Sequence, residues 1–186
     1  MGLLINGVWS TAWYDTEKSD RKFVREDAGF RHWVTADGSA GCSGKGGGQA
    51  ESGRYHLYLS HACPWAHRAM IFRQLKALND HVSVSIVHPL MSENGWSFLT
   101  DEFATGDSLY GYEFLHQIYQ KTQSDFTGRV TVPLLWDKKT QQIVFNELSE
   151  IIRMFNAAFD SITGNDLDLW PVAKREAIEG VNDDVY

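Results

Sequence analysis

A single stretch of the chain, residues 54–74 (RYHLYLSHACPWAHRAMIFRQ), constrains the fold more than any other. Tyr55, Leu57 and Leu59 alternate with more polar side chains, which is the period of a half-buried β-strand. After Pro64 the apolar side chains recur every three or four residues, which is the period of an amphipathic helix. The stretch therefore predicts a strand, a tight turn and a helix in immediate succession.

Cys63 lies at the junction between this strand and this helix. Pro64 suits the first helical position, because its φ is already helical and its missing N–H is one that the helix would leave unpaired. Cys63 is then the cap, where unpaired N–H groups and the positive end of the helix dipole favour a thiolate. His61, His67 and Arg68 can add positive potential. We predict that Cys63 is a reactive thiol, the alternative being a small buried hydrophobic side chain.

The spacing of the cysteines limits the redox chemistry. Position 66 is Ala66, so the chain lacks the CxxC pair with which thioredoxins form an intramolecular disulfide. A lone cysteine of this kind would form a mixed disulfide with an external thiol, and an abundant small thiol is the obvious partner. The other cysteine, Cys42, lies in the glycine-rich stretch 38–49 and is either an incidental exposed thiol or a resolving thiol.

Composition sets outer limits on the class of protein. The 186 residues are 43% hydrophobic and 13% aromatic, which supports a packed core rather than disorder. The net charge of −7 argues against nucleic acid or an anionic membrane as the main partner. There is no apolar run of about 18 residues and the N-terminus lacks the features of a secretory signal, so we expect a cytoplasmic protein without a membrane span.

The first 53 residues carry little periodicity. Aromatic side chains can pack an N-terminal arm onto the rest of the domain: Trp9, Trp13, Tyr14, Phe23, Phe30 and Trp33. The glycine- and serine-rich stretch 38–49 predicts a flexible loop. A phosphate-binding loop is disfavoured, because the Walker lysine spacing is missing and no apolar strand leads into the stretch.

Further periodic segments follow the first strand and helix. They predict strands over 81–90, 129–137 and 143–145, and helices over 109–121 and 147–159. The last two strands would form a hairpin that turns at 138–140, and Asn146 would cap the helix that follows. This order, with parallel strands first and an antiparallel pair last, is the α/β layout of the thioredoxin fold.

Two features of the second half of the chain indicate a ligand site. Pro133 cannot donate to a strand ladder, so the strand bends or lies at an edge, and a cis peptide there would expose the backbone of Val132 to a ligand. Glu147 lies in a first helical turn, where N–H groups bind anions and a carboxylate can take an ammonium, unless it only complements the helix dipole. An α-amino acid carries both charges. Trp96, in the polar loop 91–108, either covers a ligand or closes an edge of the core.

Four segments together resemble one family. They are CPWAHR (63–68), NGW (94–96), RVTVPLLWD (129–137) and NELSEIIRMF (146–155), and they resemble the glutathionyl-hydroquinone reductases, the Xi class of glutathione transferases. The resemblance implies an N-terminal arm and glycine-rich loop over 1–53 and a thioredoxin-like, glutathione-binding domain over 54–160. It also implies a linker and the start of an all-helical C-terminal domain over 161–186, and we expect the remainder of that domain to be absent from this chain.

The resemblance also implies a chemistry. Cys63 would attack the sulfur of a glutathionyl-hydroquinone, the hydroquinone would leave, and a second glutathione would resolve the mixed disulfide to give oxidised glutathione. Glutathione would be the co-substrate, no metal would take part, and the enzyme would be a cytoplasmic homodimer. Glutathione would be bound at the positions that match the family's site: Trp96, Arg129, Val130, Thr131, Val132, Glu147 and Leu148.

Two departures from the family pattern leave other hypotheses open. The family has a serine at the position of Leu148, and losing its hydrogen bond to the γ-glutamyl carboxylate removes about 1.5–3 kcal/mol, or about tenfold or more in affinity. The chain also stops where the family continues into helices. An inactive or merely glutathione-binding fragment is therefore one alternative. A conventional conjugating transferase is a weaker one, because a cysteine at this place favours disulfide exchange.

Overall fold

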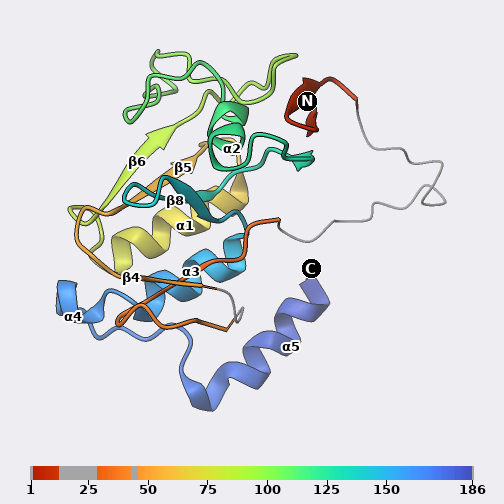
Figure 1. Ribbon diagram of the computed structural model, residues 1–186. Helices are drawn as coiled ribbons and strands as arrows, with labels where there is room; N and C mark the ends of the chain where they lie inside the picture. The colour runs from red at the N-terminus through yellow and green to blue at the C-terminus, as the bar shows by residue number, and fades with distance from the viewer. Residues whose placement is uncertain (1, 13–28, 43–45, 186) are drawn as a thin grey trace.

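A four-stranded sheet forms the centre of the computed structural model, which describes residues 2–12, 29–42 and 46–185 (Figure 1). The strands lie in the order β6 (Val82–Ile86), β5 (Tyr55–Leu59), β8 (Leu134–Asp137) and β9 (Gln142–Phe145). β5 runs parallel to β6 and antiparallel to β8, and β8 runs antiparallel to β9. This is the predicted thioredoxin layout.

Helices cover both faces of this sheet (Figure 1). α1 (Pro64–Leu75) and α3 (Leu148–Ala157) pack together on one face, and α2 (His116–Thr122) lies on the other. α1 begins at Pro64, as predicted, and turns the small side chains of Ala66 and Ala69 into the core. Small side chains at these positions allow the helix to approach its neighbours closely.

The central strand β5 is buried on both faces, whereas its alternation predicted a half-buried strand. His56 and Tyr58, on the second face, are fully buried, and the Tyr58 hydroxyl donates a hydrogen bond to Asp107 Oδ1 at 3.0 Å. A histidine and a tyrosine therefore behave as core residues here because other parts of the chain enclose them.

The helix predicted over 109–121 is shorter in the structure, since α2 begins at His116. The side chain of Asp107 is the reason. Its carboxylate accepts hydrogen bonds from the backbone N–H groups of Leu109, Tyr110 and Tyr112 at 3.1, 3.2 and 3.1 Å. An aspartate that binds nearby backbone groups competes with the helix for them, so the segment up to 112 folds around Asp107 instead.

The prediction of a flexible loop over 38–49 is wrong for its last residues. β4 (Gly47–Gln49) pairs parallel with β3 (Trp33–Thr35). A Cβ atom on Gly47 would lie 2.1 Å from the Ser39 carbonyl oxygen, and one on Gly48 would lie 2.5 Å from the Tyr55 hydroxyl. The glycines therefore serve close packing of the backbone, and not flexibility.

The N-terminal arm adds a small second sheet. β1 (Leu3–Ile5) lies between β2 (Val8–Ser10) and β7 (Gly128–Arg129), antiparallel to both. Of the aromatic residues predicted to pack the arm, Phe30 and Trp33 are buried and Trp9 packs against the core. The others lie outside the described residues: Trp13, Tyr14 and Phe23.

The segment after the sheet is held by a buried lysine. Lys76, which follows α1, has a side chain that is 1% exposed. Its Nζ lies 2.8 Å from the Asp160 carboxylate and donates to the carbonyl oxygens of Asn165 and Leu167 at 3.3 and 2.5 Å. This segment contains α4 (Asp160–Thr163) and leads through the 3₁₀ turn η1 (Val172–Lys174) into α5 (Arg175–Val185). The domain division into 1–53, 54–160 and 161–186 stays a prediction.

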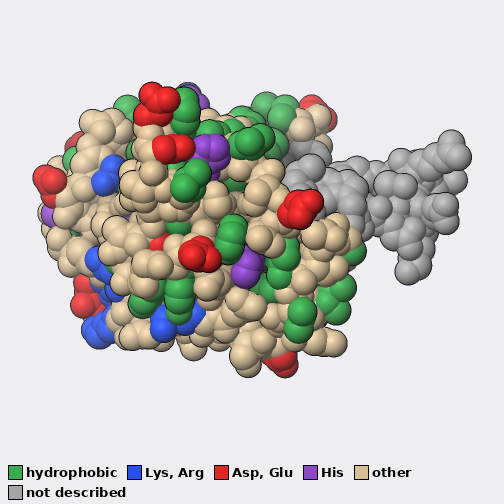
Figure 2. All heavy atoms as spheres, turned by 90° about the horizontal axis from the view of Figure 1, so that it is seen from above, with side chains coloured by type: hydrophobic (Ala, Val, Ile, Leu, Met, Phe, Trp, Pro, Cys, Tyr) green, Lys and Arg blue, Asp and Glu red, His purple; other side chains and the backbone are tan. Residues whose placement is uncertain are grey.

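The surface carries mixed charge. On the face shown in Figure 2, acidic side chains are scattered among hydrophobic ones, and Lys and Arg side chains gather toward one side. This distribution fits a chain with a net charge of −7. Among the described residues, no helix combines the length and the hydrophobicity needed to cross a bilayer.

His56 makes the stability of this fold depend on pH. Its Nδ1 lies 2.8 Å from Ser83 Oγ, and its Nε2 has no hydrogen-bond partner among the described residues. Burial, with smaller contributions from the charges of Lys138 and Arg73, lowers the pKa of His56 from 6.5 to about 3. The folded protein therefore keeps this imidazole neutral over a range in which the unfolded chain protonates it.

We expect the free energy of unfolding to decrease as the pH falls below about 6.5, because between there and about pH 3 only the unfolded chain binds a proton at His56. The contribution is at most about 1.4 kcal/mol per pH unit. Chemical denaturation from about pH 7 to about pH 5 would compare the wild type with His56→Gln, which lacks this contribution. Equal pH slopes in the two proteins would contradict the prediction.

Candidate active site

The structure confirms that Cys63 caps α1. β5 ends at Leu59, and the chain turns at Ser60, whose carbonyl oxygen accepts from Cys63 N at 3.2 Å. Cys63 has the extended dihedral angles of a cap residue, φ −98° and ψ 114°, and Pro64 is the first helical residue. The first turn of α1 contains no acidic side chain, so no carboxylate of that turn offsets the positive end of the helix dipole.

The thiol of Cys63 faces the segment before β8. Its Sγ donates to the carbonyl oxygen of Val132 at 3.5 Å and makes no bond to the N–H groups of α1. The peptide bond between Val132 and Pro133 is cis, as predicted. Within the described part of the chain, the Val132 N–H has no hydrogen-bond partner. A half-buried sulfur atom therefore lies beside a backbone segment with a donor available for an incoming ligand.

The predicted ligand residues 129–132 divide into two groups. Val130 and Val132 are buried, so a ligand at this segment meets their backbone atoms more than their side chains. Arg129 belongs to β7, which pairs with β1, and its backbone position is set by the N-terminal arm. Thr131 has both of its backbone polar groups bonded to the hydroxyl of Tyr119. Tyr119 was expected only in the apolar stripe of a helix.

The helix that follows β9 begins one residue later than predicted. Its cap is Glu147, whose Oε1 accepts from Leu148 N at 3.2 Å, so the prediction that Asn146 caps this helix is wrong. The amide group of Asn146 is engaged elsewhere, because its Nδ2 donates to Tyr119 Oη at 3.3 Å and to Thr131 Oγ1 at 3.4 Å. Asn146 therefore links this helix start to the segment beside Cys63.

Leu148, the residue that departs from the family pattern, points into the core. Its side chain is 1% exposed and belongs to the main hydrophobic cluster. It offers no polar group to a ligand, and its N–H is bonded to Glu147. The neighbouring hydroxyl of Ser149 donates to the Glu150 carboxylate. The start of α3 thus offers an anion fewer hydrogen-bond donors than it would with a serine at position 148.

Trp96 lies in a loop that the N-terminal arm supports. The indole N–H of Trp9 donates to the carbonyl oxygen of Glu93 at 2.9 Å, and its ring stacks on His116 at 4.9 Å. Trp96 itself is half-buried against the core. Within the described ranges, it makes no hydrogen bond or ring contact with Cys63. The structure therefore brings together Cys63, the 130–132 segment and the start of α3, but does not join Trp96 to them by a direct contact of these kinds.

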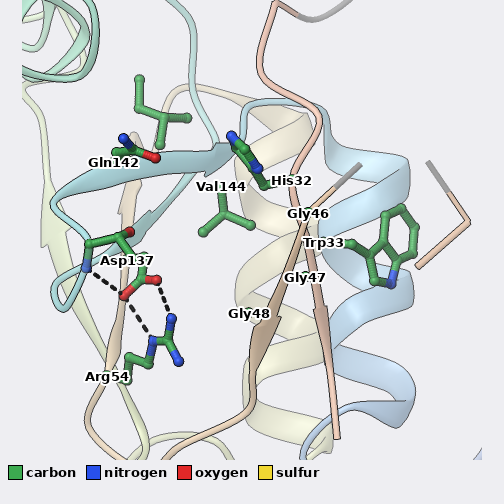
Figure 3. A pocket seen from close by; sticks show the side chains of 11 residues that line it. His32, Trp33, Gly46, Gly47, Gly48, Arg54, Asp137, Gln142 and Val144 are labelled. Carbon is green, nitrogen blue, oxygen red and sulfur yellow. Dashed lines mark hydrogen bonds and ion pairs between the residues drawn. The ribbon is translucent and has the colours of Figure 1, made fainter. Parts of the chain in front are cut away.

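A hollow lies at the end of β5 opposite to Cys63, beside the glycine-rich strand β4 (Figure 3). Arg54, just before β5, and Asp137 lie together on one side of the hollow, with Nε–Oδ1 and Nη2–Oδ2 distances of 2.9 and 2.6 Å. Donating these hydrogen bonds to Asp137 raises the pKa of Arg54. Burial opposes ionisation of Asp137, but accepting the bonds from Arg54 lowers the pKa of Asp137 overall. Arg54 also bonds to Glu51. This cluster links the start of β5 to the end of β8, at the end of β5 opposite to Cys63.

Comparisons with known proteins point to one family. Residues 62–158 match the family model of the glutathione S-transferase N-terminal domain. The chain is 54% identical over 188 residues to glutathionyl-hydroquinone reductase YqjG of Escherichia coli (strain K12), covering 100% of this chain and 57% of the relative. It is 46% identical over 186 residues to glutathionyl-hydroquinone reductase PcpF of Sphingobium chlorophenolicum, covering 100% and 56%.

Solved structures give the same picture. The glutathione-bound structure of YqjG matches with a TM-score of 0.85 and 50% identity, over 98% of this chain and 54% of that chain. A Xi-class glutathione transferase from Natrialba magadii matches with a TM-score of 0.85 and 39% identity, over 100% and 54%. The chain spans about half the length of the curated relatives it matches, 57% and 56%.

The packing of Trp9 beneath the Trp96 loop can be tested at Gly95. Gly95 has φ +79°, and a Cβ atom there would lie 2.7 Å from the Trp9 ring, whereas Gly111 has φ +68° with open space around it. We expect Gly95→Ala to lower the free energy of unfolding by about 1–3 kcal/mol more than Gly111→Ala, since only the former adds a steric clash to backbone strain. Urea denaturation of both variants measures the difference, and equal losses would mean that Trp9 does not pack against Gly95.

Proposed function

We propose that this chain, which belongs to the glutathione S-transferase family by its N-terminal domain over residues 62–158, reduces glutathionyl-hydroquinones. Glutathione is the co-substrate. The observation that carries the proposal is the placement of the Cys63 thiol. It caps a helix and lies 3.5 Å from the Val132 carbonyl oxygen, beside the Val132 N–H, which has no partner among the described residues. Two relatives at 54% and 46% identity bear the name glutathionyl-hydroquinone reductase, which supports the same reaction.

Cys63 is the nucleophile of the proposed reaction. Its thiolate attacks the sulfur of the glutathionyl-hydroquinone, a sulfur–sulfur bond forms, and the bond between that sulfur and the aromatic carbon breaks. The carbon takes the electron pair and a proton, so the hydroquinone leaves reduced. The thiolate of a second glutathione then attacks the mixed disulfide, which releases oxidised glutathione and restores the Cys63 thiolate. Over the whole cycle, the thioether sulfur of the conjugate and the thiol sulfur of the second glutathione each give up one electron, and the aromatic carbon gains both.

Glutathione is held in two places. Its cysteinyl backbone pairs with the N–H and C=O of Val132, which brings its sulfur to Cys63. Its γ-glutamyl group lies at the start of α3, where Glu147 takes the ammonium and the first N–H groups face the carboxylate. The remaining contacts come from Trp96, Arg129, Val130, Thr131 and the N–H of Leu148, which Glu147 releases when its carboxylate takes the ammonium.

The cellular setting is part of the proposal. We expect a cytoplasmic enzyme, because a reducing compartment keeps Cys63 as a thiol and supplies glutathione. A homodimer is expected from the resemblance to the Xi class. Light scattering of the purified chain measures its mass in solution, and a monomer at micromolar concentration would contradict this part.

The central test is the intact mass of the chain after exposure to a glutathionyl-hydroquinone. We expect the wild type to gain one glutathionyl group and to lose it when glutathione is added, because glutathione resolves the mixed disulfide. Cys63→Ser should gain nothing, and Cys42→Ser should behave as the wild type. A folded wild type without the adduct would overturn the proposed reaction and favour a chain that only binds glutathione or is inactive.

The buried Leu148 side chain leads to a second test. Leu148→Ser should bind glutathione about tenfold more tightly, because it restores a hydrogen bond to a charged carboxylate worth about 1.5–3 kcal/mol. It should also unfold more easily, by about 2–5 kcal/mol, since a buried leucine is lost. Calorimetric titration with glutathione and urea denaturation measure the two effects.

The matched control is Ser149→Ala, which removes the hydroxyl that donates to Glu150 and should leave the affinity for glutathione unchanged. If Leu148→Ser binds glutathione no more tightly than the wild type, the hydroxyl at this position does not contact the γ-glutamyl carboxylate.

A further inference from the structure

Tyr119, on α2, connects two parts of the chain that the proposed function uses. Its ring is fully buried and packs against Phe30 and Phe126, with ring centroids 5.7 and 5.3 Å away. This packing fixes the direction of the phenol. Its hydroxyl group reaches Thr131, next to Val132 in sequence, and the side chain of Asn146, next to Glu147.

The hydroxyl group uses its full hydrogen-bonding capacity at this point. It donates to Thr131 O at 3.0 Å, and it accepts from Thr131 N at 3.1 Å and from Asn146 Nδ2 at 3.3 Å. One donated and two accepted bonds fill the donor and both lone pairs. In a hydrogen-bonded pair of an antiparallel sheet, the N–H and C=O of one residue both bond to the residue opposite on the next strand. Here the tyrosine hydroxyl takes the place of that opposite residue.

The segment that the Tyr119 hydroxyl holds is not paired in a β-sheet. Residues 130–133 lie between β7 and β8 and belong to neither strand. Without the hydroxyl, the N–H and C=O of Thr131 would lose these partners, and partly buried backbone groups without partners cost free energy. Cys63 Sγ donates a hydrogen bond to the carbonyl oxygen of Val132, the residue after Thr131. A displacement of Thr131 would therefore move the backbone that faces the thiol.

We propose that Tyr119 is a positioning residue for glutathione, which fixes the Thr131–Val132 backbone relative to the start of α3. The two sites at which glutathione is held come from segments far apart in sequence, and one hydroxyl group bridges them. The inference rests on the proposed function, because it concerns the glutathione that Cys63 uses. Tyr119 makes no hydrogen bond to Cys63, so it reaches the thiol only through the Val132 backbone, and its main effect is on binding.

Protection of Cys63 from alkylation tests the inference. In a Cys42→Ser background, the rate of iodoacetamide alkylation without glutathione reports the reactivity of Cys63, and its dependence on added glutathione gives the half-protecting concentration. For Tyr119→Phe we expect that concentration to rise about five- to tenfold, the size of one or two lost hydrogen bonds, while the rate without glutathione stays within about twofold.

Tyr55→Phe is the matched control. Tyr55 is also fully buried, and its hydroxyl donates to Gln49 O at 2.8 Å, at the opposite end of β5 from Cys63. Tyr55→Phe removes one hydrogen bond of a buried tyrosine and should leave the half-protecting concentration unchanged. A Tyr119→Phe protein protected at the wild-type concentration would overturn the inference alone. An equal loss of Cys63 reactivity and of affinity would also overturn it, because it would indicate general damage.

Failure of the proposed function gives a different result. If glutathione does not protect Cys63 even in the Cys42→Ser parent, both the proposed function and the role of Tyr119 are overturned. If Tyr119→Phe does not fold, Asn146→Ala decides, because it removes the amide donor from the same hydroxyl. That variant should raise the half-protecting concentration about threefold, and an unchanged value would overturn the inference.

Discussion

The position of β5 in the middle of the sheet decides where the chemistry takes place. β5 is paired on both sides and every one of its residues is buried, so its carboxyl end is a fixed point. The short turn after Leu59 places Cys63 there. In the register between β5 and β8, Tyr58 lies opposite Leu134, and the residues just before Leu134 therefore come to the thiol. The contact between Cys63 and Val132 follows from this register.

Features that depend on nearby residues and simple burial could be predicted from the sequence. The alternation over Tyr55–Leu59 predicts the central strand, Pro64 marks the start of α1, and the two together identify Cys63 as its cap. The proline at 133 predicts a break in strand pairing and a cis peptide bond after Val132, and β8 begins only at Leu134. These predictions succeed because propensity, capping and hydrophobic pattern all favour the same local structure.

Features that depend on distant partners could not be predicted in this way. The helix expected from residue 109 is lost to the carboxylate of Asp107, and the glycines of β4 are required by atoms that other segments bring close. Tyr119 has the spacing of an ordinary core residue, and only the fold shows that its hydroxyl meets Thr131 and Asn146. A pattern of apolar residues indicates that a tyrosine is buried but does not indicate where its oxygen points.

α1 connects the reactive cysteine at its start to a buried lysine at its end, which holds the segment that leads to α5. Cys63 precedes the helix, and Lys76 follows it with its ammonium group bonded to Asp160, Asn165 and Leu167. A helix of 12 residues is about 18 Å long and rigid on this scale. The thiol and the point from which the chain departs toward α5 are therefore held at a fixed separation. Because Lys76 binds the segment 160–167, the length of α1 sets the distance between the Cys63 sulfur and that segment.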